Sequence, residues 1–413
     1  MKILIHRGSN EIGGTCIEIA TKNTKILLDV GQPLNDEPSD FKACDLKPDA
    51  VLVSHPHQDH YGLMDTLDAA TPVYLGDVGK DLINAVRMFI GKKLPENNFR
   101  PIQSKKTFEV GDFKVKPFLV DHSAVDAYAF LIEAEGKRIF YSGDFRATGR
   151  KAILFQNILR HPPKDIDVLF MEGTMIGRSN EDFPDEKSVE RKIYETIRKQ
   201  TNISFLVSSA QTIDRIVSAY RASKRAGKTL IIDAYTARVL ECLKKVSEHV
   251  PNMSWPGVRV FVAPKQYEAM KKNRKAFGNF FTDVFGPCRI KYDEISRDTS
   301  KYLFPCRMSF FKDIEKFISE EKINVIYSQW LGYLNDDKNY GAKELRAWKE
   351  GKDPGVNFVY AHTSGHATLD DLKRFAEAIN PKMLVPVHTE NKGSFENYFN
   401  NVVLLDDSKP FIL

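Results

Sequence analysis

The stretch Ser54-His55-Pro56-His57-Gln58-Asp59-His60 gathers metal-binding side chain types into one short segment. It holds three of the chain's ten histidines and an aspartate. The residues before it, 50–53, are apolar, so we expect the segment to be a loop at the end of a buried strand. A mixture of imidazole and carboxylate groups suits Zn²⁺ or a similar divalent ion. A lone histidine is more often a core residue, but this cluster predicts a metal site.

The spacing within the loop adds a second expectation. His55 and His57 lie two positions apart, so both can face one ion, while Asp59 and His60 can reach a second one. The five cysteines of the chain are far apart and form no Cys-x-x-Cys pair, which argues against a thiolate metal site and against a disulfide framework.

The first third of the chain reads as a sheet-rich region. Short runs of Ile, Leu and Val are broken by Gly, Asn and Pro, and one helical pattern occurs at residues 80–90. Strands are predicted at residues 2–6, 15–20, 25–30, 50–54, 113–120, 128–133 and 139–142.

The pattern changes after about Gly177, where strands and helices alternate. Such alternation predicts βαβ units on a parallel sheet. Strands are expected at 203–207, 229–233 and 324–329, and helices at 213–220, 236–246 and 313–322. Sheet-like sequence then resumes, with strands at 356–362, 382–387 and 402–405 and a helix at 369–379.

Composition fits an ordinary globular protein of more than one domain. The 413 residues are 42% hydrophobic and 28% charged. No apolar run reaches the roughly 18 residues that a membrane span needs, and the start of the chain turns polar too early for a signal peptide. We therefore expect a cytoplasmic protein with no membrane partner. The net charge of +5 does not by itself indicate nucleic acid.

The loop His55-x-His57-x-Asp59-His60 resembles the signature of the metallo-β-lactamase superfamily. The other motifs of that superfamily follow the same order along the chain: Asp29 after a strand, His122 after residues 118–121, and Asp144 in Ser-Gly-Asp. The resemblance implies an α/β fold, namely the αββα sandwich of this superfamily.

The resemblance also implies a ligand set for two divalent ions, with Zn²⁺ favoured and Mn²⁺ as the alternative. In this set His55, His57 and His122 hold one ion, Asp59 and His60 hold the other, Asp144 bridges them, and Asp29 orients a ligand histidine. Such a pair of ions would lower the pKa of a water molecule and neutralise charge that develops on a phosphodiester.

Three further motifs resemble those of the β-CASP nucleases, which process RNA or DNA. Glu172 matches motif A, His366 matches motif B, and His388 matches motif C, where it completes the second ligand set. This resemblance implies a metallo-β-lactamase domain at residues 1–176 and 356–413. A β-CASP domain with a parallel α/β sheet would be inserted at residues 177–355.

Within this branch, the opening residues 8–14 (Gly-Ser-Asn-Glu-Ile-Gly-Gly) and Ser364-Gly365-His366-Ala367 look like the RNase J family. The chain departs from that family at Thr389, where Gly is usual, and at Gly173-Thr174-Met175, which follow motif A. It ends about 25 residues after His388, so we expect no counterpart of the C-terminal dimerisation domain of RNase J.

The resemblance implies catalytic and phosphate-binding roles as well. Asp59 would act at the metal centre, and His366, hydrogen-bonded to Glu172, would protonate the leaving oxygen. Candidate phosphate contacts are Ser364, Gly365, Ser209 and Arg215. For Ser209 and Arg215, an ordinary helix cap followed by a surface arginine is an equally good interpretation.

The expected function is a metal-dependent ribonuclease that cuts single-stranded RNA in endonucleolytic or 5′-exonucleolytic mode. DNA is the main alternative substrate, because no residue pattern reveals a reader of the 2′-hydroxyl. A small-molecule hydrolase fits less well because of the long insertion and motifs A to C. A catalytically inactive binding protein also fits less well, because every ligand position is filled. The oligomeric state stays open.

Overall fold

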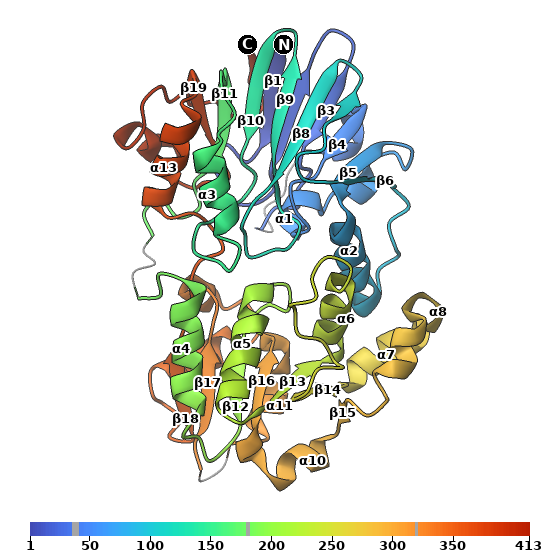
Figure 1. The fold of residues 1–413 in the computed structure, drawn as a ribbon, viewed down its shortest axis with the longest axis vertical. Coiled ribbons are helices and arrows are strands. Elements are labelled where there is room, and N and C mark those ends of the chain that lie inside the picture. Colours follow the sequence, from blue (N-terminus) through green and yellow to red (C-terminus); the bar gives the residue numbers. More distant parts are fainter. Residues whose placement is uncertain (35–40, 179–181, 319–320) are drawn as a thin grey trace. The chain divides into compact units, whose positions relative to one another are not determined.

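The computed structural model describes residues 1–34, 41–178, 182–318 and 321–413, and the chain divides into two compact units (Figure 1). The first unit comprises Met1–Ile83, Pro95–Ser179 and Gly365–Leu413. The second unit comprises Asn84–Leu94 and Asn180–Ser364. Each unit has its own sheets and its own core, and each is described by itself below.

The first unit contains two mixed β-sheets. One sheet has the order β20 (Pro410–Ile412), β1 (Lys2–Arg7), β2 (Cys16–Ala20), β3 (Lys25–Leu28), β4 (Ala50–Leu52), β5 (Pro72–Gly76) and β6 (Asn98–Ile102). The other has the order β19 (Met383–Val387), β11 (Val168–Glu172), β10 (Lys137–Tyr141), β9 (Tyr128–Ala134), β8 (Phe113–Leu119) and β7 (Phe108–Val110).

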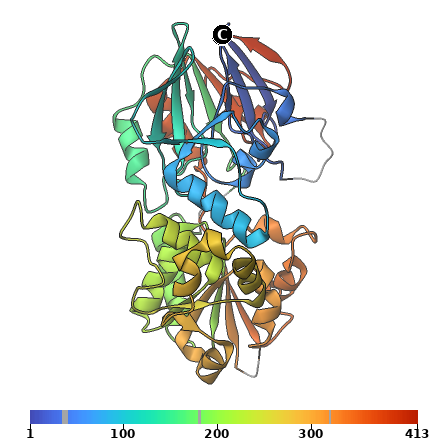
Figure 2. The same ribbon diagram turned by 90° about the vertical axis from the view of Figure 1, so that its right-hand side faces the viewer.

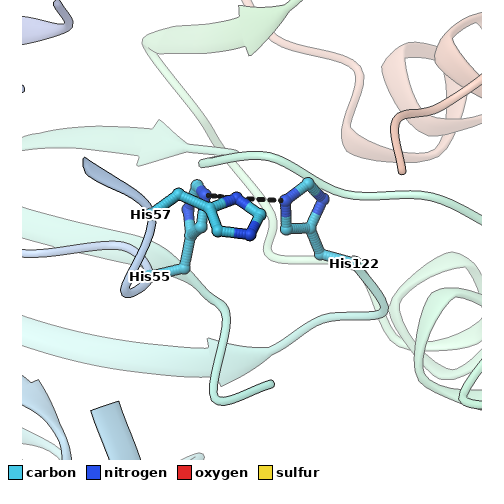
Figure 3. A group of neighbouring side chains, drawn as sticks. All are labelled: His55, His57 and His122. Atoms are coloured by element: carbon cyan, nitrogen blue, oxygen red, sulfur yellow. Dashed lines mark hydrogen bonds between the residues drawn. The ribbon is translucent and has the colours of Figure 1, made fainter. Parts of the chain in front are cut away.

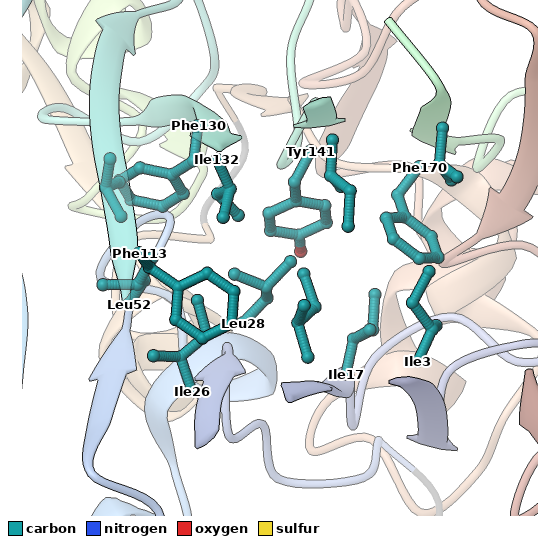
Figure 4. Close-up of a cluster of buried hydrophobic side chains, with 14 of the residues drawn as sticks. Ile3, Ile17, Ile26, Leu28, Leu52, Phe113, Phe130, Ile132, Tyr141 and Phe170 are labelled. Atoms are coloured by element: carbon teal, nitrogen blue, oxygen red, sulfur yellow. The ribbon is translucent and has the colours of Figure 1, made fainter. Parts of the chain in front are cut away.

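The two sheets enclose the main core of the first unit (Figure 4). Ile17 and Ile26 extend from the first sheet, and Phe130, Tyr141 and Phe170 extend from the second. Strands alternate side chains between their two faces, so each sheet has a second face to bury. Helices bury these outer faces: α1 (Gln58–Tyr61) and α2 (Asp77–Ile90) on the first sheet, and α3 (Ile153–Arg160) and α13 (Leu369–Ile379) on the second. The predicted αββα fold class is confirmed.

The second unit is built on one parallel sheet, whose strands are covered by helices on both faces (Figure 2). Its order is β15 (Arg289–Ile290), β14 (Val258–Phe261), β13 (Thr229–Asp233), β16 (Tyr302–Cys306), β12 (Ser204–Val207), β17 (Ile323–Tyr327) and β18 (Val356–Tyr360). The helices are α4 (Glu186–Ile197), α5 (Ile213–Arg225), α6 (Ala234–Leu243), α7 (Pro264–Lys272), α8 (Arg274–Phe277), α9 (Asn279–Asp283), α10 (Tyr292–Arg297), α11 (Phe311–Glu315) and α12 (Ala342–Lys349). In the described ranges, none of the helices is long and apolar enough to cross a membrane.

The structure corrects the predicted domain limits at two points. The strand Val356–Tyr360 was assigned to the first domain, but it pairs in parallel with β17 in the sheet of the second unit. The first unit resumes only at Gly365. The segment Asn84–Leu94 also belongs to the second unit, although it is the end of a helix whose first half lies in the first unit.

Three smaller predictions also differ from the structure. The helix expected at 313–322 is shorter, ending at Glu315, and residues 319–320 lie outside the described ranges. The strand expected at 402–405 is reduced to a single bridge from Val402 to Leu384. The terminal strand β20 was not foreseen, because it begins with Pro410; it lies at a sheet edge, where a residue without an N–H is tolerated.

Candidate metal centre

The predicted site residues of the first unit follow the carboxyl ends of its strands. Asp29 comes after β3, His55 after β4, His122 after β8, Asp144 after β10, and His388 after β19. Strands β3 and β4 run parallel, as do β10, β11 and β19, so these strands end together at one edge of each sheet. The topology therefore gathers side chains that are up to 359 positions apart, counted from Asp29 to His388.

Three imidazole nitrogens converge at the first predicted ligand set (Figure 3). Nδ1 of His57 lies 3.1 Å from Nε2 of His55 and 3.4 Å from Nε2 of His122. His55 and His122 are fully buried. Three nitrogens that point at one another can share only a few protons, so their lone pairs suit a common cation.

The second predicted ligand set lies around one oxygen of Asp144. Oδ2 of Asp144 is 3.2 Å from Nε2 of His60 and 3.7 Å from Nε2 of His388. The same oxygen is 3.7 Å from Nε2 of His55, so Asp144 lies between the two sets. Oδ2 of Asp59 is 3.8 Å from each of the His60 and His388 Nε2 atoms.

Oxygen atoms next to the opposite ring nitrogens orient four of the five histidines. Nδ1 of His122 donates to the carbonyl of Gly365 at 2.6 Å, and Nδ1 of His60 lies 2.7 Å from the Asp29 carboxylate. Nδ1 of His55 lies 3.1 Å from Oγ of Ser54, and Nδ1 of His388 lies 2.9 Å from Oγ1 of Thr15. When Nδ1 of His55, His60 or His122 carries the proton, Nε2 presents its lone pair to the centre. Nδ1 of His388 also accepts from the backbone N–H of Gly13 at 3.3 Å.

Asp29 is the most heavily hydrogen-bonded of these supporting residues. Its carboxylate accepts from the backbone N–H of Ser54 at 2.6 Å, from the Ser54 hydroxyl at 2.8 Å, and from the Tyr141 hydroxyl at 2.5 Å. The residue is fully buried and has a φ of 58°, in the left-handed region that few non-glycine residues adopt. These contacts, together with that to His60, hold the strained backbone in place.

Burial sets the protonation state of most of the histidines. It lowers the pKa of His57 to about 4 and depresses the pKa values of His55 and His122 well below their usual range. It also lowers the pKa of His388. Four imidazoles are therefore neutral at physiological pH, the state in which histidine binds metal.

His60 and Asp144 show that the centre requires positive charge. Burial would lower the pKa of His60, but the carboxylates of Asp144, Asp29 and Asp59 outweigh it and raise that pKa well above its usual value. Burial would raise the pKa of Asp144, but the surrounding histidines, among them the protonated His60 and His366, keep it well below its usual range. Buried carboxylates at this density need cationic neighbours, and a divalent ion supplies such charge.

Unsatisfied atoms provide a direct test of whether this donor set fits a metal. The buried Nε2 atoms of His60 and His388 have no hydrogen-bond partner among the described residues. Buried polar atoms are rarely left unpaired, because desolvation without a partner costs free energy. Both atoms face the Asp144 carboxylate, which lies too far away to bond well to His388, so the donor set fits divalent metal binding.

An ion pair beside the two sets joins Glu172 to His366. Nδ1 of His366 lies 2.9 Å from Oε2 of Glu172 and 3.8 Å from Oδ2 of Asp144. Burial would lower the pKa of His366, but the Glu172 carboxylate outweighs it and raises that pKa to about 9. Glu172 is itself fixed by the backbone N–H of Phe145, which donates to Oε1 at 3.0 Å.

Arg215 is a correction to the sequence analysis. Its side chain is fully buried in the second unit, where it forms an ion pair of 2.9 Å with the buried Glu186. It also donates to the carbonyl of Ser328 at 2.8 Å. The guanidinium is therefore engaged within the protein and does not reach an RNA phosphate.

The other candidate phosphate contacts have local structural partners. Ser209 is half-buried in the turn before α5, where its Oγ accepts from the N–H of Gln211 at 3.2 Å. The Gly365 carbonyl accepts from His122, and Ser364 is buried. These contacts place Gly365 beside the metal centre and leave the phosphate role of all three residues as a proposal.

Sequence reasoning missed the supporting residues Thr15, Tyr141, Thr174 and Thr389. Tyr141 lies in a strand of the main core, and the apolar pattern of that strand predicts only that the residue is buried. The structure shows in addition that its hydroxyl donates to Asp29. Ser54 was visible next to the histidines, but its bonds to Asp29 and His55 depend on the fold.

Two family models match parts of the chain. A model described as the beta-lactamase superfamily domain matches residues 27–191, and one described as the Zn-dependent metallo-hydrolase RNA specificity domain matches residues 357–401. The chain is thus similar to the metallo-β-lactamase superfamily over the first of these ranges. The first match contains Asp29 to Glu172, and the second contains His366 and His388, whereas the opening motif at residues 8–14 lies outside both ranges.

Two archaeal proteins are similar to this chain over nearly their whole length. The chain is 25% identical to a Methanocaldococcus jannaschii protein described as Probable RNase MJ4, over 94% of this chain and 93% of the relative. It is 24% identical to an RNase J-like protein of the same organism, over 94% of this chain and 92% of that relative. It also matches ribonuclease J of Helicobacter pylori at 21% identity, but covers only 56% of that longer protein.

A solved structure supports the fold. An Enterococcus faecalis protein described as being of unknown function superposes with a TM-score of 0.77 and 22% identity. The match covers 100% of this chain and 99% of the other.

Replacing Arg215 tests its structural role. We expect Arg215→Ala to lower the free energy of unfolding by about 3–5 kcal/mol, because it breaks the buried ion pair with Glu186. Arg221→Ala, at an exposed position of the same helix, is the matched control and should change stability by less than about 0.5 kcal/mol. Urea denaturation followed by circular dichroism measures both. Equal stability of the two variants would contradict the assignment.

Proposed function

We propose that this protein is a metal-dependent ribonuclease that hydrolyses phosphodiester bonds in single-stranded RNA. The observation that carries the proposal is the arrangement of two histidine and aspartate ligand sets around Asp144, with the His366–Glu172 pair beside them. The match to an RNA specificity domain and the ribonuclease names of full-length relatives support RNA as the substrate.

In this proposal the ligand sets hold two divalent ions. The first set is His55, His57 and His122, and the second is Asp59, His60 and His388, with Asp144 shared between them. Zn²⁺ is the favoured ion and Mn²⁺ the alternative, because imidazole and carboxylate ligands suit both. Bound ions would supply an activated water and neutralise charge on the phosphate.

His366 has the position of a general acid. Glu172 accepts the Nδ1 proton of His366, so Nε2 is the ring nitrogen proposed to protonate the leaving oxygen of the RNA. The carboxylate also favours the protonated ring, which is the form that donates. Ser364, Gly365 and Ser209 are proposed to contact the RNA phosphates, a role that Arg215 does not share.

Matched substrates test the polymer and the mode of cleavage. We expect labelled single-stranded RNA to be cut in the presence of Mn²⁺ or Zn²⁺, and a DNA of the same sequence to be cut much more slowly. RNA with a 5′-monophosphate, RNA with a 5′-triphosphate and circular RNA separate exonucleolytic from endonucleolytic cleavage. Faster cleavage of the DNA would establish the DNA nuclease alternative, and the absence of cleavage of either polymer would refute the proposal.

Removal of the metal or of its ligands tests the metal centre. Chelation should abolish cleavage, and His57→Ala and Asp144→Ala should each remove detectable turnover, because each deletes a group that faces an ion. His161→Ala changes an exposed histidine of the same unit and should retain full activity. Elemental analysis should find metal in the wild type and less in the two ligand variants. Cleavage by a protein shown to be metal-free would contradict the proposal.

A third experiment separates acid catalysis from metal binding at His366. His366 also lies near His122 and Asp144 in a geometry that could hold an ion, so the two roles must be distinguished. We expect His366→Ala to keep the full metal content while cleavage slows by about 10²–10⁴-fold. Glu172→Gln should give a smaller loss, because it keeps the ring but weakens its orientation.

The leaving group provides the control for this assignment. A nitrophenyl phosphodiester has a leaving group that needs little protonation, so His366→Ala should slow it far less than it slows RNA. In contrast, His388→Ala should lose metal and slow both substrates. Loss of an ion from His366→Ala, or equal slowing of both substrates, would show that His366 is not the acid.

A further inference from the structure

Two loops that carry proposed functional groups leave the first unit from neighbouring strands. Strands β11 and β19 pair in parallel, with Glu172 opposite Val387. The chain then continues as Gly173-Thr174 after β11 and as His388-Thr389 after β19. The proposed acid pair and the proposed metal ligand His388 therefore diverge from the same point of the sheet.

Two buried threonines cross-link these loops reciprocally. The Thr389 hydroxyl donates to the carbonyl of Gly173 at 3.0 Å, and the Thr174 hydroxyl donates to the carbonyl of His388 at 3.3 Å. Thr389 is fully buried and Thr174 nearly so, with an exposed fraction of 6%. Each loop thus donates one hydrogen bond through a hydroxyl and accepts one at a carbonyl. This pattern fixes both the spacing and the relative rotation of the two loops.

The Thr174 hydroxyl acts on a backbone that needs support. His388 has a φ of 52°, a left-handed conformation that costs free energy for a residue with a β-carbon. Its N–H donates to the carbonyl of Gly8 at 2.7 Å, and its carbonyl accepts from Thr174. With both backbone groups bound, the imidazole is directed so that Nε2 faces Asp144.

The same loops determine the position of Glu172. The N–H of Thr174 donates to Oε2 of Glu172 at 3.4 Å, and this is the oxygen that accepts from His366. The carbonyl of Gly173, which Thr389 binds, belongs to the same peptide group as this N–H of Thr174. Gly173 must be glycine here, because a β-carbon would lie 2.5 Å from the Phe395 ring and 3.1 Å from Thr389.

We propose that Thr174 and Thr389 form a reciprocal threonine clamp that positions His388 for metal binding and ties it to the Glu172–His366 pair. The two are positioning residues, since neither hydroxyl contacts a proposed ligand atom or the acid directly. The inference rests on the proposed function, in which His388 binds a metal ion and the Glu172–His366 pair supplies the acid. It assigns roles to Thr174 and Thr389 themselves, at positions where the sequence departs from the RNase J pattern.

Valine and serine replacements separate positioning from packing. Valine keeps the shape of threonine but removes its hydroxyl, whereas serine keeps the hydroxyl. We expect Thr389→Val to weaken Zn²⁺ binding at the position of His388 by roughly 10–100-fold, the usual effect of losing a group that orients a ligand. Competition with a chromophoric chelator measures this affinity. Thr389→Ser should restore most of it, and Thr174→Val should act in the same direction.

Spectroscopy gives a readout that does not depend on turnover. In protein loaded with Co²⁺, Thr389→Val should change the visible absorption of the bound ion, because the geometry of His388 changes. The double variant Thr174→Val/Thr389→Val should lose less than the sum of the two single losses, since each single replacement already loosens the same pair of loops. Thr107→Val, at an exposed position of the first unit, is the control and should change neither affinity nor spectrum.

The outcomes distinguish the clamp from the proposed function. Unchanged Zn²⁺ affinity and Co²⁺ absorption in Thr389→Val, with only a lower melting temperature, would overturn the clamp and leave two ordinary structural threonines. Failure of serine to rescue would overturn it as well. A wild type that binds Zn²⁺ but cleaves no nucleic acid would refute the ribonuclease proposal, and the metal measurements would still decide whether the clamp positions His388.

Discussion

The buried carboxylate of Asp29 connects both ligand sets of the metal centre. It binds His60 of the second set directly, and it binds the Ser54 hydroxyl, which in turn contacts His55 of the first set. One side chain thereby fixes the ring orientation of a ligand in each set. Because its own backbone is left-handed and its other partner, Tyr141, comes from the opposite sheet, Asp29 depends on the closed sandwich around it.

The sandwich restricts the side chains of the site. Strands from both sheets end beside the metal centre, and the main core lies between the two sheets. A histidine on a free loop would lose rotamer freedom on binding an ion, whereas buried rings with fixed Nδ1 partners have lost it already. By burying these rings, the core residues reduce the entropy that the histidines lose when an ion binds.

Much of the fold and the site could be predicted from the sequence because their signals are local. The strands are short apolar runs, and the ligands follow them directly, as at His55 after β4. Arg215 could not be interpreted in this way, since its partner Glu186 lies 29 positions away on another helix. Likewise, nothing local distinguishes Val356–Tyr360 from a strand of the first unit; only its pairing with β17 assigns it. The hydroxyls of Thr174 and Thr389 act on carbonyls, which carry no sequence signal.

The shared helix α2 has a consequence for the order in which the chain folds. Its second half belongs to the second unit, where the Phe89 ring contacts Tyr235 and Phe277 at centroid distances of 5.5 and 5.1 Å. During synthesis, Phe89 leaves the ribosome well before Tyr235 and Phe277 are made. The apolar face of this part of the helix therefore stays exposed until they are. A fragment limited to Asn180–Ser364 would lack Phe89 altogether and expose the rings that it covers. The inserted unit is therefore continuous in space but not along the chain, and its folding has to be completed by a segment that is made first.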